Sequence, residues 1–205
     1  VDKYKHILIT RKLRHHSGIK FESQIESLIK AYRLARDAFN DFDYVSIFHT
    51  SQLFTKTGYA DYIKNYDFSY DELGQPLPNR YDKIKHQSIM KGYVDDHNDS
   101  SHYKYQIVEM AFYTKALFDM IDQAIDTFPV DLPALTSTFN QSPIEEIIIP
   151  TLCEYFRKKY DLRQGKNILK QINVDQDYEL EDWQFTIKSI PRNLDHHLRV
   201  KMRNI

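Results

Sequence analysis

The stretch "HYKYQIVEMAFYTKALFDMIDQAIDTF", residues 102–128, carries the strongest structural pattern in the chain. Its apolar residues recur at intervals of three and four, so they would form one broad face on an α-helix. Pro129 follows directly and would end such a helix, because proline lacks the backbone N–H that the next helical turn needs. The pattern predicts a buried helix over 102–128, with its apolar face made by Ile107, Met110, Ala111, Leu117, Phe118, Ile121, Ala124 and Ile125.

Helix-like spacing also occurs on both sides of this stretch. It predicts a helix over 21–39, and a further apolar segment over 44–54 that would pair with a short helix over 59–68 as a helical hairpin. Residues 81–94 and 165–173 are expected to form short helices. Residues 142–162 predict a helix that Pro150 kinks or splits. The pattern of 177–190 fits either a strand or a helix.

Residues 69–79 form the clearest break, because they contain Gly74, Pro76 and Pro78 and show no periodicity. We therefore expect a mainly α protein: a helical bundle with a helical N-terminal extension. The extension would span residues 1–68, the linker 69–79 and the main helical domain 80–205.

Composition limits the function classes. The formal net charge of −1 gives no overall field that would attract nucleic acid or a membrane. Cys153 is the only cysteine, so a disulfide within the chain and a Cys-rich zinc site are both excluded. No run of 18 apolar residues could span a membrane, and the N-terminus turns basic where a signal peptide would stay apolar. We expect a cytoplasmic protein that does not contact a membrane.

The sequence "DDHND" places Asp95, Asp96 and Asp99 close together. This spacing resembles the Asp-rich metal motif of isoprenoid synthases, but a second acidic motif is missing. We interpret these residues as a solvated acidic loop, and we expect no metal site and no cofactor.

The chain ends with "IPRNLDHHLRVKMRNI", residues 190–205. Three Arg–His pairs in the chain are separated by four to six residues: Arg11–His16, Arg80–His86 and Arg192–His197. Only Arg192 is followed by a polar residue of the Asn, Asp or His type, which is Asn193. The pattern Arg192-Asn193-x-x-x-His197 resembles the motif of HEPN-domain ribonucleases, which lies in a late helix of an all-helical fold.

The resemblance implies a metal-independent endoribonuclease, of the kind used in defence or toxin systems, that acts as a homodimer in which two such motifs meet. His197 would move protons while a ribose 2′-hydroxyl attacks the adjacent phosphate. Arg192 would stabilise charge on the phosphate oxygens, and Asn193 would orient the histidine or the phosphate.

Basic residues near both ends of the chain would bind RNA in this scheme; they are Arg11, Arg14, Arg199, Lys201 and Arg203. Two alternatives stay open. The chain could be a non-catalytic helical module that binds another protein, or an accessory factor that uses the basic segments 11–16 and 199–203 to bind nucleic acid.

Overall fold

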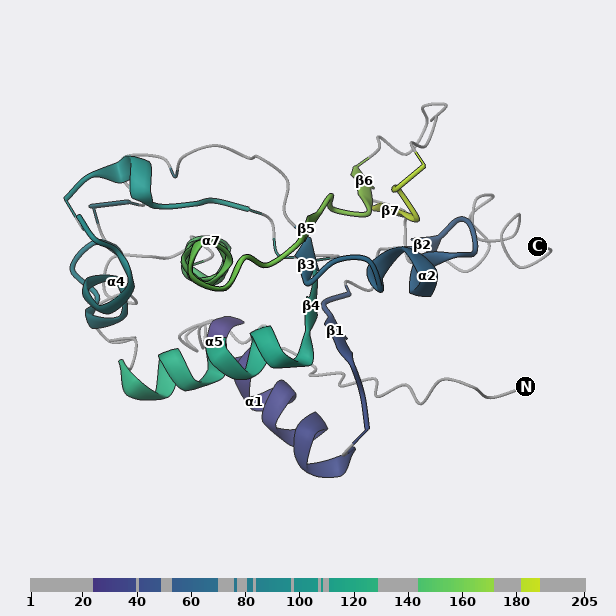
Figure 1. Ribbon diagram of the computed structural model, residues 1–205, viewed down its shortest axis with the longest axis horizontal. Helices are drawn as coiled ribbons and strands as arrows, with labels where there is room; N and C mark the ends of the chain where they lie inside the picture. Colours follow the sequence, from purple (N-terminus) through teal and green to yellow (C-terminus); the bar gives the residue numbers. More distant parts are fainter. Residues whose placement is uncertain are drawn as a thin grey trace, which may run out of the picture.

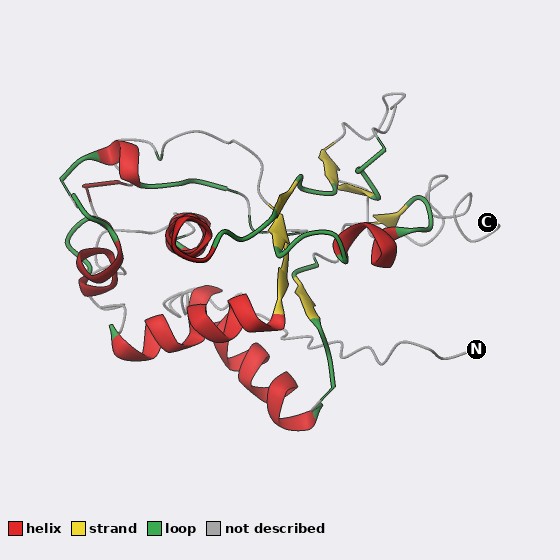
Figure 2. Cartoon of the chain, in the orientation of Figure 1, coloured by secondary structure: helices red, strands yellow, loops and turns green. Residues whose placement is uncertain are grey.

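The computed structural model describes residues 24–39, 41–48, 53–69, 76, 81–82, 84–96, 98–106, 108, 111–128, 144–171 and 182–188. A four-stranded sheet runs through the middle of the molecule (Figures 1 and 2). The larger helices lie on one side of it, and a smaller sheet with one short helix lies on the other. Within the described residues the helices are α1 (Gln24–Ala38), α2 (Tyr59–Ile63), α4 (Ser88–Tyr93), α5 (Lys115–Thr127), α7 (Glu145–Tyr160) and the 3-10 helix η1 (Ser100–His102).

The central sheet has the strand order β1-β4-β3-β5. Strand β4 pairs antiparallel with both β1 and β3, whereas β3 and β5 are parallel. The smaller sheet has the order β2-β7-β6. The strands are β1 (Tyr44–Ser46), β2 (Leu53–Phe54), β3 (Phe68–Ser69), β4 (Phe112–Thr114), β5 (Gln164–Gly165), β6 (Leu169–Gln171) and β7 (Thr186–Lys188).

The prediction of a mainly α bundle, and with it the all-α class, is wrong, because the fold combines helices with these sheets. The segment 102–128 shows why. Among the described residues of this segment, Lys115–Thr127 form an α-helix, whereas Phe112–Thr114 form a strand whose Phe112 and Tyr113 are both buried. A short strand buried on both faces has a continuous apolar run that periodicity alone cannot distinguish from a helix. The same ambiguity affects 44–54 and 165–173, which were predicted to be helical and contain β1, β2, β5 and β6.

The predicted helices at 21–39 and 142–162 are confirmed as α1 and α7. Helix α7 continues through Pro150 without a break. Proline cannot donate the hydrogen bond that Glu146 C=O would normally accept. The backbone N–H of Gln106 donates to that oxygen instead, at 2.9 Å, so the carbonyl is satisfied from outside the helix.

One large apolar core joins α1, α4, α5 and α7 to the central sheet. Its members come from both sides of the proposed linker 69–79, for example Ile25 and Tyr32 before it and Phe118 and Ile148 after it. A smaller aromatic cluster lies between α2 and the second sheet and contains Ile63, Phe112, Ile168 and Phe185. Among the helices that the structure describes, none is long and apolar enough to cross a bilayer.

Candidate functional site

The residues of the predicted ribonuclease site lie outside the described residues. This applies to Arg192, Asn193 and His197, and equally to the basic residues Arg11, Arg14, Arg199, Lys201 and Arg203. Their roles therefore stay predictions.

The acidic segment 95–99 is exposed where the structure describes it, which confirms its interpretation as a solvated loop. Asp99 caps the short helix η1 by accepting hydrogen bonds from the backbone N–H and the hydroxyl of Ser101, at 2.8 and 2.7 Å. These hydrogen bonds lower the pKa of Asp99. Within the described ranges, no group of three His, Cys, Asp or Glu residues is placed to hold a metal ion.

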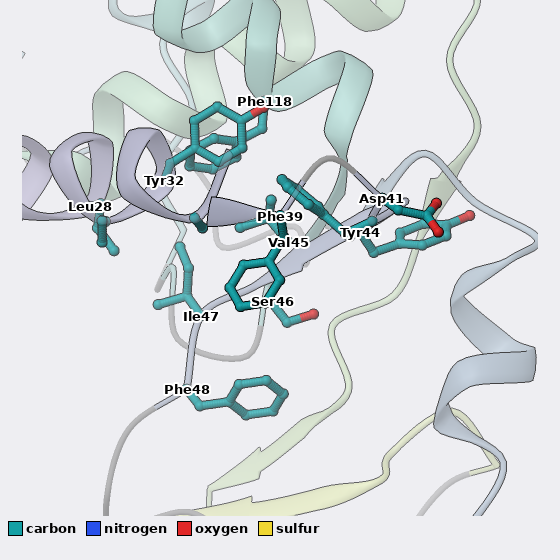
Figure 3. Close-up of a pocket in the computed structure, with 13 residues that line it drawn as sticks. Leu28, Tyr32, Phe39, Asp41, Tyr44, Val45, Ser46, Ile47, Phe48 and Phe118 are labelled. Carbon is teal, nitrogen blue, oxygen red and sulfur yellow. The ribbon is translucent and has the colours of Figure 1, made fainter. Parts of the chain in front are cut away.

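A groove between α1 and β1 is the main candidate site in the described part of the molecule (Figure 3). Its volume is about 330 Å³, at the small end of the roughly 300–1,000 Å³ typical of ligand pockets. Leu28, Ala31 and Ala35 line it from the helix, Val45 lines it from the strand, and Ile47 lines it from just after the strand. The other lining residues are Tyr32, Phe39, Asp41, Phe42, Tyr44, Ser46, Phe48 and Phe118.

The apolar surface continues beyond the groove. Phe48 lines its rim and is 49% exposed, and Phe54 beside it is 43% exposed. The two rings lie 5.3 Å apart between centroids, and both contact the ring of Tyr59. An exposed aromatic pair next to an apolar groove provides more apolar surface than isolated exposed side chains usually do.

Polar contacts between α1 and α5 fix the helical wall of the groove. Arg33 and Arg36 both bind the carboxylate of Asp122 on α5, which is only 5% exposed. The hydroxyl of Tyr32 donates to Asp119 at 2.6 Å. Burial and this hydrogen bond together raise the pKa of Tyr32. The contacts hold α1 against α5, so the groove has a firm wall.

One free carboxylate borders the groove. Asp41 is exposed and lines it, and in the part of the chain that the structure describes its side chain forms no hydrogen bond or ion pair. The mouth of an otherwise apolar groove therefore carries a negative charge that no described residue pairs with, and a positively charged group would be attracted to it.

Cys153 does not line the groove and lies in the main core. Its side chain is 1% exposed within the main core, and burial raises the pKa of its thiol. Cys153 is therefore a small buried residue of the core and not an accessible nucleophile.

Sequence reasoning missed the groove entirely. Residues 44–48 were predicted to be helical, which would have pointed their side chains around a cylinder rather than to the two faces of a strand. The available signal was the aromatic content of 39–48, which contains Phe39, Phe42, Tyr44 and Phe48. Comparison with family models, curated proteins and solved structures found no match for the chain.

Proposed function

We propose that the protein is a non-catalytic interaction module that uses the groove between α1 and β1 to bind an apolar segment of a partner protein. The observation that supports this is the continuity of the groove with the exposed pair Phe48 and Phe54. Contiguous exposed apolar surface is a common mark of a binding site, whereas single exposed apolar residues are not.

A polypeptide fits this surface better than a small cofactor does. The groove alone would hold only a few apolar side chains, and the Phe48–Phe54 pair extends the apolar surface past its rim. A small molecule in the groove would leave that pair in water. A peptide that runs along β1 would cover both regions, and buried apolar area is the main favourable contribution to such binding.

The free thiol of Cys153 is typical of a reducing compartment, so we place this binding function in the cytoplasm.

The test is to select peptides from a displayed random library against the parent protein and to measure their affinity by fluorescence anisotropy. Ala35→Trp fills the groove from its helical wall, and we expect it to weaken binding by about tenfold or more, since the burial of even one apolar side chain is lost. Ala116→Trp is the matched control, because Ala116 is exposed on α5 and does not line the groove.

Both variants should melt close to the parent protein. Equal affinities of the Ala35→Trp and Ala116→Trp proteins, or a selection that yields no peptide at all, would overturn the proposed binding function.

A second proposal rests on the sequence motif Arg192-Asn193-x-x-x-His197. In it the chain is a homodimeric, metal-independent endoribonuclease, and the basic residues of the two terminal segments bind RNA. The mixed fold removes the all-helical support for the resemblance to HEPN ribonucleases, so the motif alone favours this function.

RNA cleavage with and without EDTA tests the ribonuclease proposal. We expect His197→Ala and Arg192→Ala to lower the rate by about two to four powers of ten, which is the usual contribution of an acid or base catalyst. His196→Ala is the control because it differs by one position and should matter less. If the parent cuts no RNA, or if all three variants cut it equally well, the motif is not catalytic.

A further inference from the structure

We infer that the partner binds as an extended strand that adds to the free edge of β1 and places alternate side chains in the groove. The inference rests on the proposed binding function and specifies its geometry. It comes from the hydrogen-bonding pattern of the central sheet rather than from the apolar character of the groove.

Among the residues that the structure describes, strand β1 lies at one edge of the sheet and β4 is its only neighbour. Two backbone hydrogen bonds fix which way its polar groups point. The N–H of Ile47 donates to Ala111 C=O at 3.1 Å, and the N–H of Lys115 donates to Asp43 C=O at 2.7 Å. In an antiparallel pair, hydrogen-bonded and non-hydrogen-bonded residue pairs alternate. Because Val45 is paired with Tyr113, residues 43, 45 and 47 form the set that faces β4.

Strand β4 confirms this alternation from its other side. The N–H of Thr114 donates to Asp67 C=O, and the N–H of Phe112 donates to the hydroxyl of Ser69. Both groups point toward β3, so Thr114 and Phe112 cannot donate to the β1 residues opposite them, Tyr44 and Ser46.

The backbone N–H and C=O groups of Tyr44 and Ser46 therefore point away from the sheet. In the ranges that the structure describes, no hydrogen bond involves these four groups. An edge with unpaired backbone groups is a template for another strand, and proteins that recognise peptides by strand addition use such an edge.

The groove runs along this same edge. It is lined by all three residues of β1, although successive side chains of a strand point to opposite faces of the sheet. A groove that borders all three follows the edge of the strand rather than one face. A strand added there would form hydrogen bonds with Tyr44 and Ser46, and every second side chain would enter the space between β1 and α1 (Figure 3).

Asp41 adds a charge preference. Its free carboxylate lies just before β1 and lines the groove, so a lysine or arginine of the added strand would be favoured at that end. The partner is an extended segment of another protein, with apolar residues at alternate positions and one basic residue.

Ser46→Pro tests the strand geometry. It removes the outward N–H of Ser46, which has no partner in the free protein, and proline is tolerated at an edge where the N–H faces away from the sheet. Ser46→Ala is the matched control, because both variants lose the contact between the Ser46 and Tyr59 hydroxyls. The probe is the tightest peptide selected by display against the parent protein, and its affinity is measured by anisotropy.

We expect the Ser46→Pro protein to bind this peptide roughly tenfold or more weakly than the Ser46→Ala protein does. Both should keep the melting temperature to within a few degrees of each other.

The results distinguish peptide binding in the groove from strand addition to β1. If Ser46→Pro and Ser46→Ala bind equally while Ala35→Trp still weakens binding, the groove binds a peptide but strand addition is wrong. If Ala35→Trp has no effect either, the proposed binding function has failed. If the parent forms a dimer that Ser46→Pro dissociates, the bound segment comes from a second copy of this chain, and the inference that it comes from another protein is wrong.

Discussion

Helix α1 is closed on the side that faces α5 and open on the side that faces β1. Toward α5, two arginines and a tyrosine meet aspartates at hydrogen-bonding distance. Toward β1, small and apolar side chains line a groove of about 330 Å³. The contacts with α5 hold the helix in place, whereas the groove beside β1 leaves apolar surface available to a binding partner.

The largest expected change in the free energy of unfolding comes from removing the ion pairs between α1 and α5. Asp122→Ala leaves the guanidinium groups of Arg33 and Arg36 without their shared, buried partner. We expect the free energy of unfolding to fall by about 2–4 kcal/mol, as is usual when one member of a buried ion pair is removed. Urea denaturation measures this loss.

Asp126→Ala is the matched control for that variant. Asp126 also pairs with Arg33, but it is 66% exposed, so its loss should cost less than about 1 kcal/mol. Similar losses for the two variants would mean that the closed side is not held by the buried carboxylate.

The second expected effect is a pH dependence of stability caused by a buried carboxyl group. Glu145, in the first turn of α7, is 2% exposed, and burial raises its pKa to about 7. The folded state therefore binds a proton at Glu145 more tightly than the unfolded state does. The stability that Glu145 contributes is fully present below the ordinary glutamate pKa and is lost as pH rises through about 7.

Glu145→Gln should remove this dependence. We expect the variant to match the parent near pH 4 and to be more stable by about 2–3 kcal/mol at pH 8. Thermal or urea unfolding at the two pH values measures the difference. A difference that does not change with pH would contradict a protonated Glu145 in the core.

The smallest effect on stability is expected on the open side. Phe48→Ala removes a half-exposed ring, so the free energy of unfolding should change by only about 0.5 kcal/mol. The affinity for a display-selected peptide should nevertheless fall severalfold. Leu34→Ala is the control, because Leu34 is 63% exposed on α1 and does not line the groove. A larger loss of affinity for the Leu34 variant would place the binding surface elsewhere.

Sequence periodicity was sufficient for the long elements and insufficient for the short ones. Helices α1 and α7 are amphipathic or buried over fifteen and sixteen residues, which is long enough for a helical repeat to be recognised. Strands β1 and β4 have three residues each, which is too short to show the two-residue repeat of a strand. Their apolar side chains were therefore counted as part of a helical pattern. The position of α7 was predicted. The hydrogen bond from Gln106 N–H to Glu146 C=O was not predicted, because it joins segments that are distant in the sequence.

The candidate site was even less accessible to sequence reasoning. A motif search favours polar and titratable residues, and it led to Arg192 and His197. The groove consists mostly of apolar residues such as Leu28, Ala35 and Val45, which look like ordinary core residues in the sequence. They become a candidate site only because β1 is an edge strand, and the strand order results from long-range pairing.

Amide hydrogen exchange in the free protein, followed residue by residue by NMR, tests the central claim most directly. If β1 has a free edge, the amide hydrogens of Val45 and Ile47 exchange slowly, because they face β4 and the preceding Ala111, whereas those of Tyr44 and Ser46 exchange quickly. Slow exchange at all four positions would contradict the account, because it would show that the edge is already occupied in the protein alone.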